Sequence, residues 1–215
     1  MMEFQNIEIH WLGHASFLIK YYGIRIFIDP FKLKNNVKKE ADYVFITHSH
    51  YDHLSIDDLS QMKIKNIIAP ADAISKLRRL DTNLIIVQPE KEYELKEFKF
   101  RTVPAYNTEK PFHPKINEWL GYLLIFDNVT VYHAGDTDAI HEMSSISGKV
   151  DIALLPIGGT YTMNAEEAVY AIKLIKPKIV IPMHYGTIVG SRNDVEKLKS
   201  LLAEEKIEVV ELEEE

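Results

Sequence analysis

A short histidine-rich segment constrains the fold more than any other feature of this chain. Residues 47–53 read Thr-His-Ser-His-Tyr-Asp-His and directly follow an apolar, β-prone run. Side chains two residues apart at a strand end point the same way, so His48 and His50 can bind one cation together. The chain then turns, and Asp52 and His53 face a new direction, toward a second cation. Imidazole and carboxylate suit zinc, manganese or iron.

The composition limits the available ligands and the classes of function. The chain has 215 residues, 46% of them hydrophobic and 27% charged, which fits one globular domain over residues 1–215. It contains no cysteine, so we expect neither a thiolate metal site nor a disulfide. Its net charge of −7 is opposite in sign to that of a nonspecific nucleic-acid binder. With no signal-peptide pattern and no apolar run of membrane-spanning length, we expect a cytoplasmic protein.

Strand patterns outnumber helix patterns along the chain. The clearest predicted strands are rich in β-branched and aromatic residues and cover residues 7–12, 16–21, 24–28, 98–103, 122–126 and 129–132. Helices are predicted to begin at Asn164 and Ser191, where Glu167 and Asp194 complete capping boxes. This mixture favours two sheets with helices on the outside, in the α/β class.

Together with three further segments, the histidine-rich segment resembles the metallo-β-lactamase superfamily of metal-dependent hydrolases. The further segments are Phe27-Ile28-Asp29-Pro30, Tyr132-His133-Ala134-Gly135-Asp136-Thr137 and Ile181-Pro182-Met183-His184-Tyr185. The resemblance implies a four-layer αββα sandwich with the site at one edge of its two sheets. It also implies that Asp136 bridges two metal ions and that His184 completes the second. We expect Asp29 to orient the ligand loop rather than to bind metal.

One motif narrows the resemblance to a branch of that superfamily. Trp11-Leu12-Gly13-His14-Ala15-Ser16 is similar to the branch of the ascorbate-6-phosphate lactonase and, more distantly, of the N-acyl-phosphatidylethanolamine phospholipase D enzymes. The similarity favours His14 as a site residue. The alternative is a corner histidine that is hydrogen-bonded to the backbone.

The sequence departs from the family where a third motif supplies a histidine to the first metal. The matching stretch reads Val-Pro-Ala-Tyr-Asn at residues 103–107, so Asn107 stands in the expected position. An amide oxygen is a weaker ligand for zinc than imidazole, and this ion would be held loosely. His113 and His14 are rival candidates, and the sequence leaves the three open.

The residues and the resemblance together imply hydrolysis by a metal-activated water. We expect one or two divalent ions, zinc before manganese or iron, with Asp52, His14 and His113 as catalytic candidates. Asp52 could also accept a proton from the bridging water. Alternative functions are a nuclease of the same superfamily, which the acidic charge disfavours, and a non-hydrolytic metal-binding or redox protein.

The substrate is expected to be small and anionic, such as a lactone, a phosphodiester or an amide. Lys110, His113 and Lys115 lie within six residues of a proline-stiffened loop just past Asn107. Cations beside the metal edge would attract phosphate or carboxylate. The alternative is that both lysines face solvent. We expect no membrane partner, consider a nucleic-acid partner disfavoured, and leave self-association into a homo-oligomer open.

Overall fold

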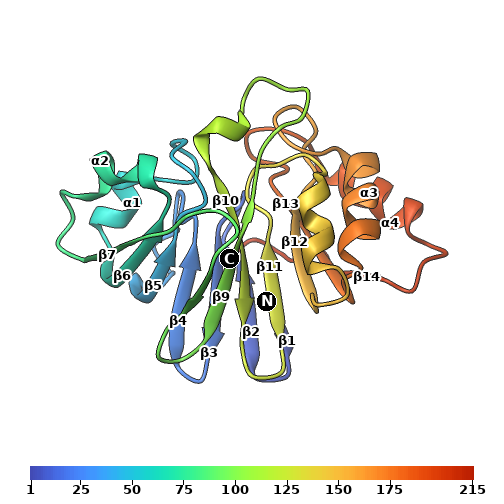
Figure 1. Ribbon diagram of the computed structural model, residues 1–215. Helices are drawn as coiled ribbons and strands as arrows, with labels where there is room; N and C mark the ends of the chain where they lie inside the picture. The colour runs from blue at the N-terminus through green and yellow to red at the C-terminus, as the bar shows by residue number, and fades with distance from the viewer. The chain divides into compact units, whose positions relative to one another are not determined.

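The chain folds into two units, each built on one seven-stranded mixed sheet. The computed structural model describes residues 1–215. The first unit comprises residues 1–87 and 212–215, and the second comprises residues 88–211. Strands of the first sheet run from blue to teal in Figure 1, and those of the second sheet run from green to red. Two mixed sheets with helices are what the sequence predicts.

The first sheet keeps its strands in sequence order. Its members are β1 (Met2–Phe4), β2 (Ile7–Trp11), β3 (Phe17–Tyr21), β4 (Ile24–Ile28), β5 (Glu40–Phe45), β6 (Lys63–Ala69) and β7 (Asn83–Ile86). The strands β1 to β4 pair antiparallel, and β4 to β7 pair parallel. A tight turn at Tyr22-Gly23 joins β3 to β4, and both residues have the positive φ that such a hairpin turn needs.

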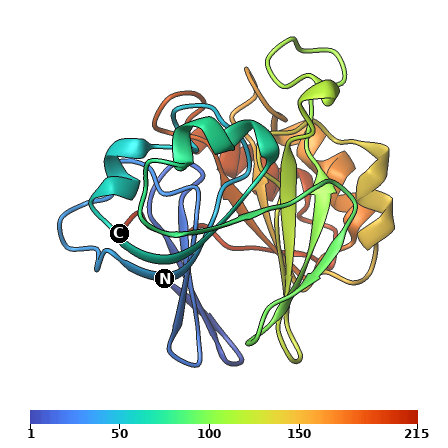
Figure 2. The ribbon, with the colours of Figure 1, turned by 60° about the vertical axis from the view of Figure 1, so that its left-hand side comes forward.

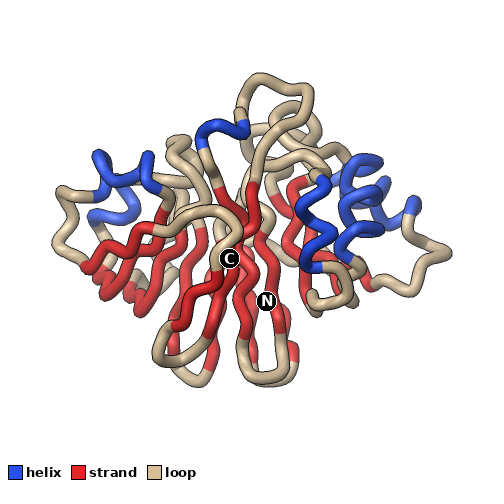
Figure 3. Tube along the Cα trace, in the orientation of Figure 1, coloured by secondary structure: helices blue, strands red, loops and turns tan.

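Two short helices cover the parallel part of this sheet. They are α1 (Ile56–Ser60) and α2 (Ile74–Leu77), drawn in blue in Figure 3. The side chain of Ser55 caps α1 by accepting from the backbone of Asp58. Leu59 and Leu77 of the helices pack into one buried apolar cluster with residues of the sheet, and this cluster fixes the loops between strands and helices.

The second sheet repeats the plan of the first. Its members are β8 (Glu92–Glu94), β9 (Lys99–Pro104), β10 (Leu120–Ile125), β11 (Thr130–His133), β12 (Ile152–Pro156), β13 (Ile179–Met183) and β14 (Glu208–Val209). The strands β8 to β11 pair antiparallel, and β11 to β14 pair parallel. The longer helices of this unit are α3 (Ala165–Ile175) and α4 (Arg192–Leu201).

Both predicted capping boxes are present in the second unit. The side chain of Asn164 accepts from Glu167, whose carboxylate accepts from the Asn164 backbone, and Ser191 and Asp194 do the same for α4. The helix α3 packs beside α4 and beside a 3₁₀ helix at His141–Ile146, which is yellow in Figure 1 and Figure 2. No helix of the chain is both long and apolar enough to cross a membrane.

The strand directions gather the candidate site residues at one edge of each sheet. In the first unit, β2, β4 and β5 run the same way, so the loops that carry His14, Asp29 and the histidine-rich segment leave from one edge. In the second unit, β9, β11 and β13 also share a direction. Their ends lead to the Asn107 loop, to Asp136 and to His184. Functional side chains of such sheets lie at the carboxyl ends of the strands.

Candidate metal centre

The loop that follows β5 presents two imidazole nitrogens to each other. The Nε2 atom of His48 and the Nδ1 atom of His50 lie 3.1 Å apart. Thr47 sets the tautomer of His48: its hydroxyl donates to Asp29 at 2.6 Å and therefore accepts from Nδ1 of His48 at 2.9 Å. The proton of His48 thus sits on Nδ1, and the Nε2 lone pair faces His50. This is the geometry of two ligands for one cation.

A fully buried carboxylate lies behind these ligands. Asp29 accepts from the backbone N–H of Thr47 at 2.8 Å, from the Thr47 hydroxyl, and from Nδ1 of His53 at 2.7 Å. With three donors bound to it, the Asp29 carboxylate holds Thr47 and His53 in place. A carboxylate behind a histidine fixes the ring and raises its basicity as a ligand. Sequence reasoning missed Thr47, although its place between the strand and His48 was a signal.

Asp52 lies with His53 and His14 in a second set of donors. The Oδ2 atom of Asp52 is 3.0 Å from Nε2 of His14 and 3.7 Å from Nε2 of His53. Ligand atoms of these three residues lie within 4.8 Å of one another. Within this unit, His14 therefore belongs to the donor set of Asp52 and His53. The side chain of His14 thus contacts the Asp52 carboxylate.

In the second unit, two imidazoles converge on one carboxylate oxygen. The Oδ2 atom of Asp136 is 3.0 Å from Nε2 of His184 and 3.2 Å from Nε2 of His113. All three side chains are buried. Asp136 follows β11 and His184 follows β13, the two parallel strands that flank β12.

The structure engages every polar atom of the Asn107 amide. Its Oδ1 accepts from the backbone N–H and from Nδ1 of His113, at 3.0 and 2.9 Å. Its Nδ2 donates to Asp138 Oδ1 at 3.1 Å and to the Tyr161 carbonyl at 2.9 Å. An amide oxygen only accepts, so Nδ1 of His113 carries the proton and Nε2 presents a lone pair toward Asp136. The Asn107 amide thus supports the His113 ring, and Nε2 of His113 faces Asp136.

Asp138 anchors the same loop and was missed by sequence reasoning. Besides Asn107, its carboxylate accepts from the backbone of Thr108 at 2.9 Å and from Lys110 at 2.6 Å. Its place two residues after Asp136, in a strand-end loop, was the available signal. Partial burial acts to lower the pKa of Lys110, but the hydrogen bonds and charges of Asp138 and Glu167 outweigh it and raise that pKa.

The two lysines of this loop have carboxylate partners, which removes the basis for a free positive field. Lys110 contacts Asp138 and Glu167, and Lys115 contacts Glu142 at 2.7 Å. The Lys115 ammonium also lies 4.7 Å from the centre of the Tyr106 ring. Hydrogen bonds to Glu142 and then to Tyr106 raise the pKa of Lys115. Both lysine charges are therefore paired with carboxylates.

Left-handed backbone marks several of these residues. His14, Asp29 and His184 have φ values of 51°, 46° and 58°. Such conformations are costly for residues other than glycine and concentrate at functional sites. Gly158 accommodates the turn at His184, because a Cβ at Gly158 would overlap the His184 carbonyl oxygen.

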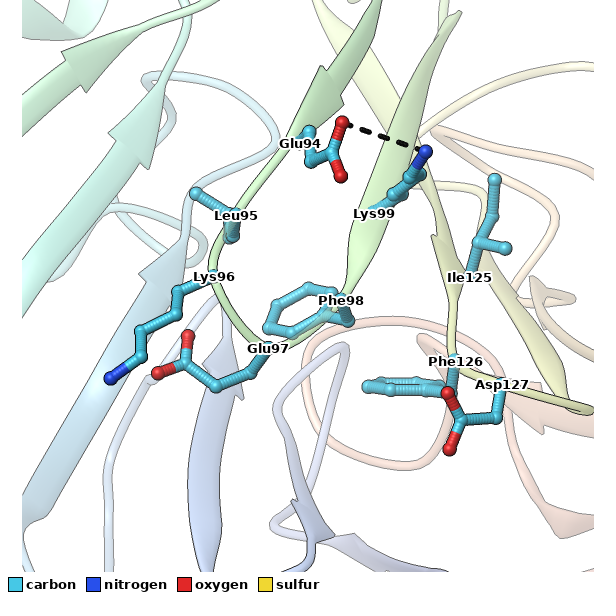
Figure 4. A pocket seen from close by; sticks show the side chains of 9 residues that line it. All are labelled: Glu94, Leu95, Lys96, Glu97, Phe98, Lys99, Ile125, Phe126 and Asp127. Atoms are coloured by element: carbon cyan, nitrogen blue, oxygen red, sulfur yellow. Dashed lines mark ion pairs between the residues drawn. The ribbon is translucent and has the colours of Figure 1, made fainter.

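Other polar features of the two units lie outside these donor sets. His10 contacts Glu215 at 2.7 Å, and Nδ1 of His133 accepts from the backbone of Gly135 at 3.2 Å. A pocket at the turn between β8 and β9 contains no histidine, and its Glu94 and Lys99 form an ion pair (Figure 4). None of these supplies metal ligands.

Comparisons with known proteins agree with the chemistry of these residues. The model of the beta-lactamase superfamily domain matches residues 8–184. A UPF0173 metal-dependent hydrolase of Pyrococcus furiosus is 35% identical over 213 residues, covering 92% of this chain and 93% of that protein.

Two solved structures show the same fold. A crystal structure of a protein from Parabacteroides distasonis has a TM-score of 0.86 at 31% identity, covering 96% of this chain and 94% of that one. Igni18, a metallo hydrolase from Ignicoccus hospitalis, has a TM-score of 0.79 at 27% identity, covering 96% and 95%. The predicted metallo-β-lactamase fold is thereby confirmed. The chain belongs to the UPF0173 metal-dependent hydrolases of the metallo-β-lactamase superfamily.

Proposed function

We propose that the protein hydrolyses a small molecule with the aid of one or two divalent metal ions. The proposed ligands are His48, His50, Asp52 and His53 of the first unit and His113, Asp136 and His184 of the second, with His14 beside Asp52. When bound, such a metal supplies an activated water at neutral pH and stabilises negative charge on the substrate.

The contact between His113 and Asp136 carries this proposal. Asn107 holds the proton of His113 on Nδ1, so an imidazole lone pair and a carboxylate oxygen face each other at 3.2 Å. Two acceptors this close, in a buried place, need a cation or a proton between them. The donor set contains imidazole and carboxylate with no thiolate, which fits zinc, manganese or iron.

His113 changes what we expect of the first metal ion. A neutral amide ligand predicted a loosely held ion, whereas an imidazole supported by Asn107 is a strong donor. We therefore propose two ions of comparable affinity, with zinc as the first metal to test. Asn107 serves as a positioning residue.

Asp52 and His14 are proposed to handle a proton. The Asp52 carboxylate is mostly buried and lies 3.0 Å from Nε2 of His14. Asp52 can accept a proton from the attacking water, and His14 can share it until a leaving group takes it. Removing either side chain is expected to reduce kcat more than it raises KM.

The branch motif at His14 makes lactones the first substrates to test, followed by phosphodiesters and amides. The experiment is a substrate screen on metal-free protein and on protein reloaded with zinc, manganese or iron. We expect hydrolysis only after reloading, and its loss in Asp136→Ala. Hydrolysis that persists without metal, or that survives in Asp136→Ala, contradicts the proposal.

A further inference from the structure

Exposed apolar side chains gather on the loops that carry the proposed ligands. Nine large hydrophobic residues of the chain are exposed, and five of them lie within four residues of a proposed ligand. These five, which we call the apolar rim, are Tyr51, Ile56, Phe112, Ile116 and Ile188. Exposed apolar residues scattered singly are ordinary, but their concentration at functional loops indicates a binding role.

Two residues of the apolar rim rest on aromatic rings that reach the donor sets. In the first unit, Tyr51 is 67% exposed and packs edge-on against Phe31, whose ring lies 6.0 Å from that of His14. In the second unit, Phe112 packs edge-on against Tyr161 at 4.8 Å, and the Tyr161 carbonyl accepts from Asn107. In each unit, an exposed ring is thus held in place next to the ligands.

A pocket in the second unit extends the apolar rim. Ile116 is 88% exposed and lines this pocket with Tyr106 and Trp119. The Trp119 ring packs edge-on against His113, with ring centres 5.5 Å apart. One wall of the pocket therefore touches a proposed metal ligand.

The charges around this pocket do not favour an anion. Its lysine, Lys115, is paired with Glu142, and the remaining charged residues of the lining are Glu90 and Glu118. The apolar part of the lining comes from Tyr106, Ile116 and Trp119 with two prolines, and this part suits a neutral organic group.

We propose that the substrate carries a neutral alkyl or aryl group, which Phe112 and Ile116, the part of the apolar rim beside the pocket of the second unit, bind next to the scissile bond. This rests on the proposed hydrolytic function and names its substrate class. An anionic group at the same position is disfavoured by Glu90 and Glu118. Specificity for this group then comes from Phe112 and Ile116.

A series of matched esters tests the proposal on the metal-loaded enzyme. The neutral members are 4-nitrophenyl acetate, butyrate and hexanoate, and the anionic member is mono-4-nitrophenyl succinate, which has the acyl length of the butyrate. We expect kcat/KM to rise about two- to fourfold per added methylene, the upper figure being that of full burial. We expect the succinate to react more slowly than the butyrate.

Variants of the apolar rim show where the selectivity arises. Phe112→Ala and Ile116→Ala are expected to flatten the dependence of kcat/KM on chain length. Tyr170→Ala is the matched control, because Tyr170 is 59% exposed on α3 and far in sequence from every proposed ligand. It should behave as wild type.

A binding measurement separates this proposal from the hydrolytic function. The neutral fluorophore N-phenyl-1-naphthylamine is titrated into the metal-loaded wild type and into the same three variants. If no ester is hydrolysed but the probe binds several-fold more weakly to Phe112→Ala and Ile116→Ala than to Tyr170→Ala, the hydrolytic function fails and the apolar rim stands. If esters are hydrolysed with no dependence on chain length, or fastest for the succinate, the apolar rim is overturned and hydrolysis stands.

Discussion

Replacement of Asn107 by alanine separates a supporting role of this side chain from a ligand role. The change removes the acceptor of two His113 donors and the donor to Asp138 and to the Tyr161 carbonyl. These four hydrogen bonds join buried or half-buried groups and contribute about 1 kcal/mol each. Asp138 keeps Thr108 and Lys110 as donors, so the loss of its hydrogen bond to Asn107 should cost little. The other three lost hydrogen bonds should lower the free energy of unfolding by about 3 kcal/mol.

The metal affinity is the more informative quantity. Without the amide, His113 is free to rotate and to move its proton to Nε2, where it no longer serves as a ligand. Loss of a supporting residue costs about 10- to 100-fold in metal affinity. We expect that loss in Asn107→Ala, and a larger one in His113→Ala, which removes the donor itself.

Competition with a chromogenic chelator measures zinc affinity, and urea denaturation of the metal-free proteins measures stability. Asn193→Ala, with its exposed amide at the start of α4, is the matched control and should change neither. An unchanged zinc affinity in Asn107→Ala would refute the supporting role. A larger loss in Asn107→Ala than in His113→Ala would show instead that the amide is the ligand.

Three further outcomes are expected. Thr47→Val removes the hydroxyl between Asp29 and His48 and should weaken zinc binding about tenfold. Equilibrium dialysis measures the zinc affinity, and Thr82→Val is the control variant. Lys110→Met should lower the unfolding free energy by about 2 kcal/mol, seen in urea, and leave KM for a phosphorylated ester unchanged, whereas a raised KM would restore the anionic site. Burial acts to raise the pKa of Asp151, but hydrogen bonds and charge from Lys178 and hydrogen bonds from Thr130 outweigh burial and lower that pKa. The ionised Asp151 carboxylate therefore stabilises the folded protein above the unfolded-state pKa of about 3.9. This stabilisation is lost as the pH falls through the lower pKa of the folded state. The stability difference between wild type and Asp151→Asn should therefore shrink below about pH 4 in denaturation curves, and a constant difference would contradict this.

Features set by local spacing could be predicted from the sequence. His48 and His50 come shortly after a strand and two residues apart, and their nitrogens meet at 3.1 Å. The capping boxes at Asn164 and Ser191 depend on contacts three residues apart, and both are present.

Features that depend on distant parts of the chain could not be predicted. The contact between Asn107 and His113 depends on a loop that folds back on itself, with the Asn107 N–H donating to the His113 carbonyl at 2.7 Å. The carboxylates that compensate Lys110 come from Asp138 and Glu167, 28 and 57 residues away in the sequence. A cluster of lysines in a sequence shows its own charge and not its partners.

The metal content of the protein, purified without chelator, tests the central claim most directly. Elemental analysis by mass spectrometry is applied to wild type, to Asp136→Ala and to the double variant His48→Ala/His50→Ala. We predict up to two ions per chain in wild type, and loss of most of the metal in both variants, because each removes donors that no other residue replaces. A wild-type protein that binds no divalent metal even after reloading, or variants that retain the wild-type content, would contradict it.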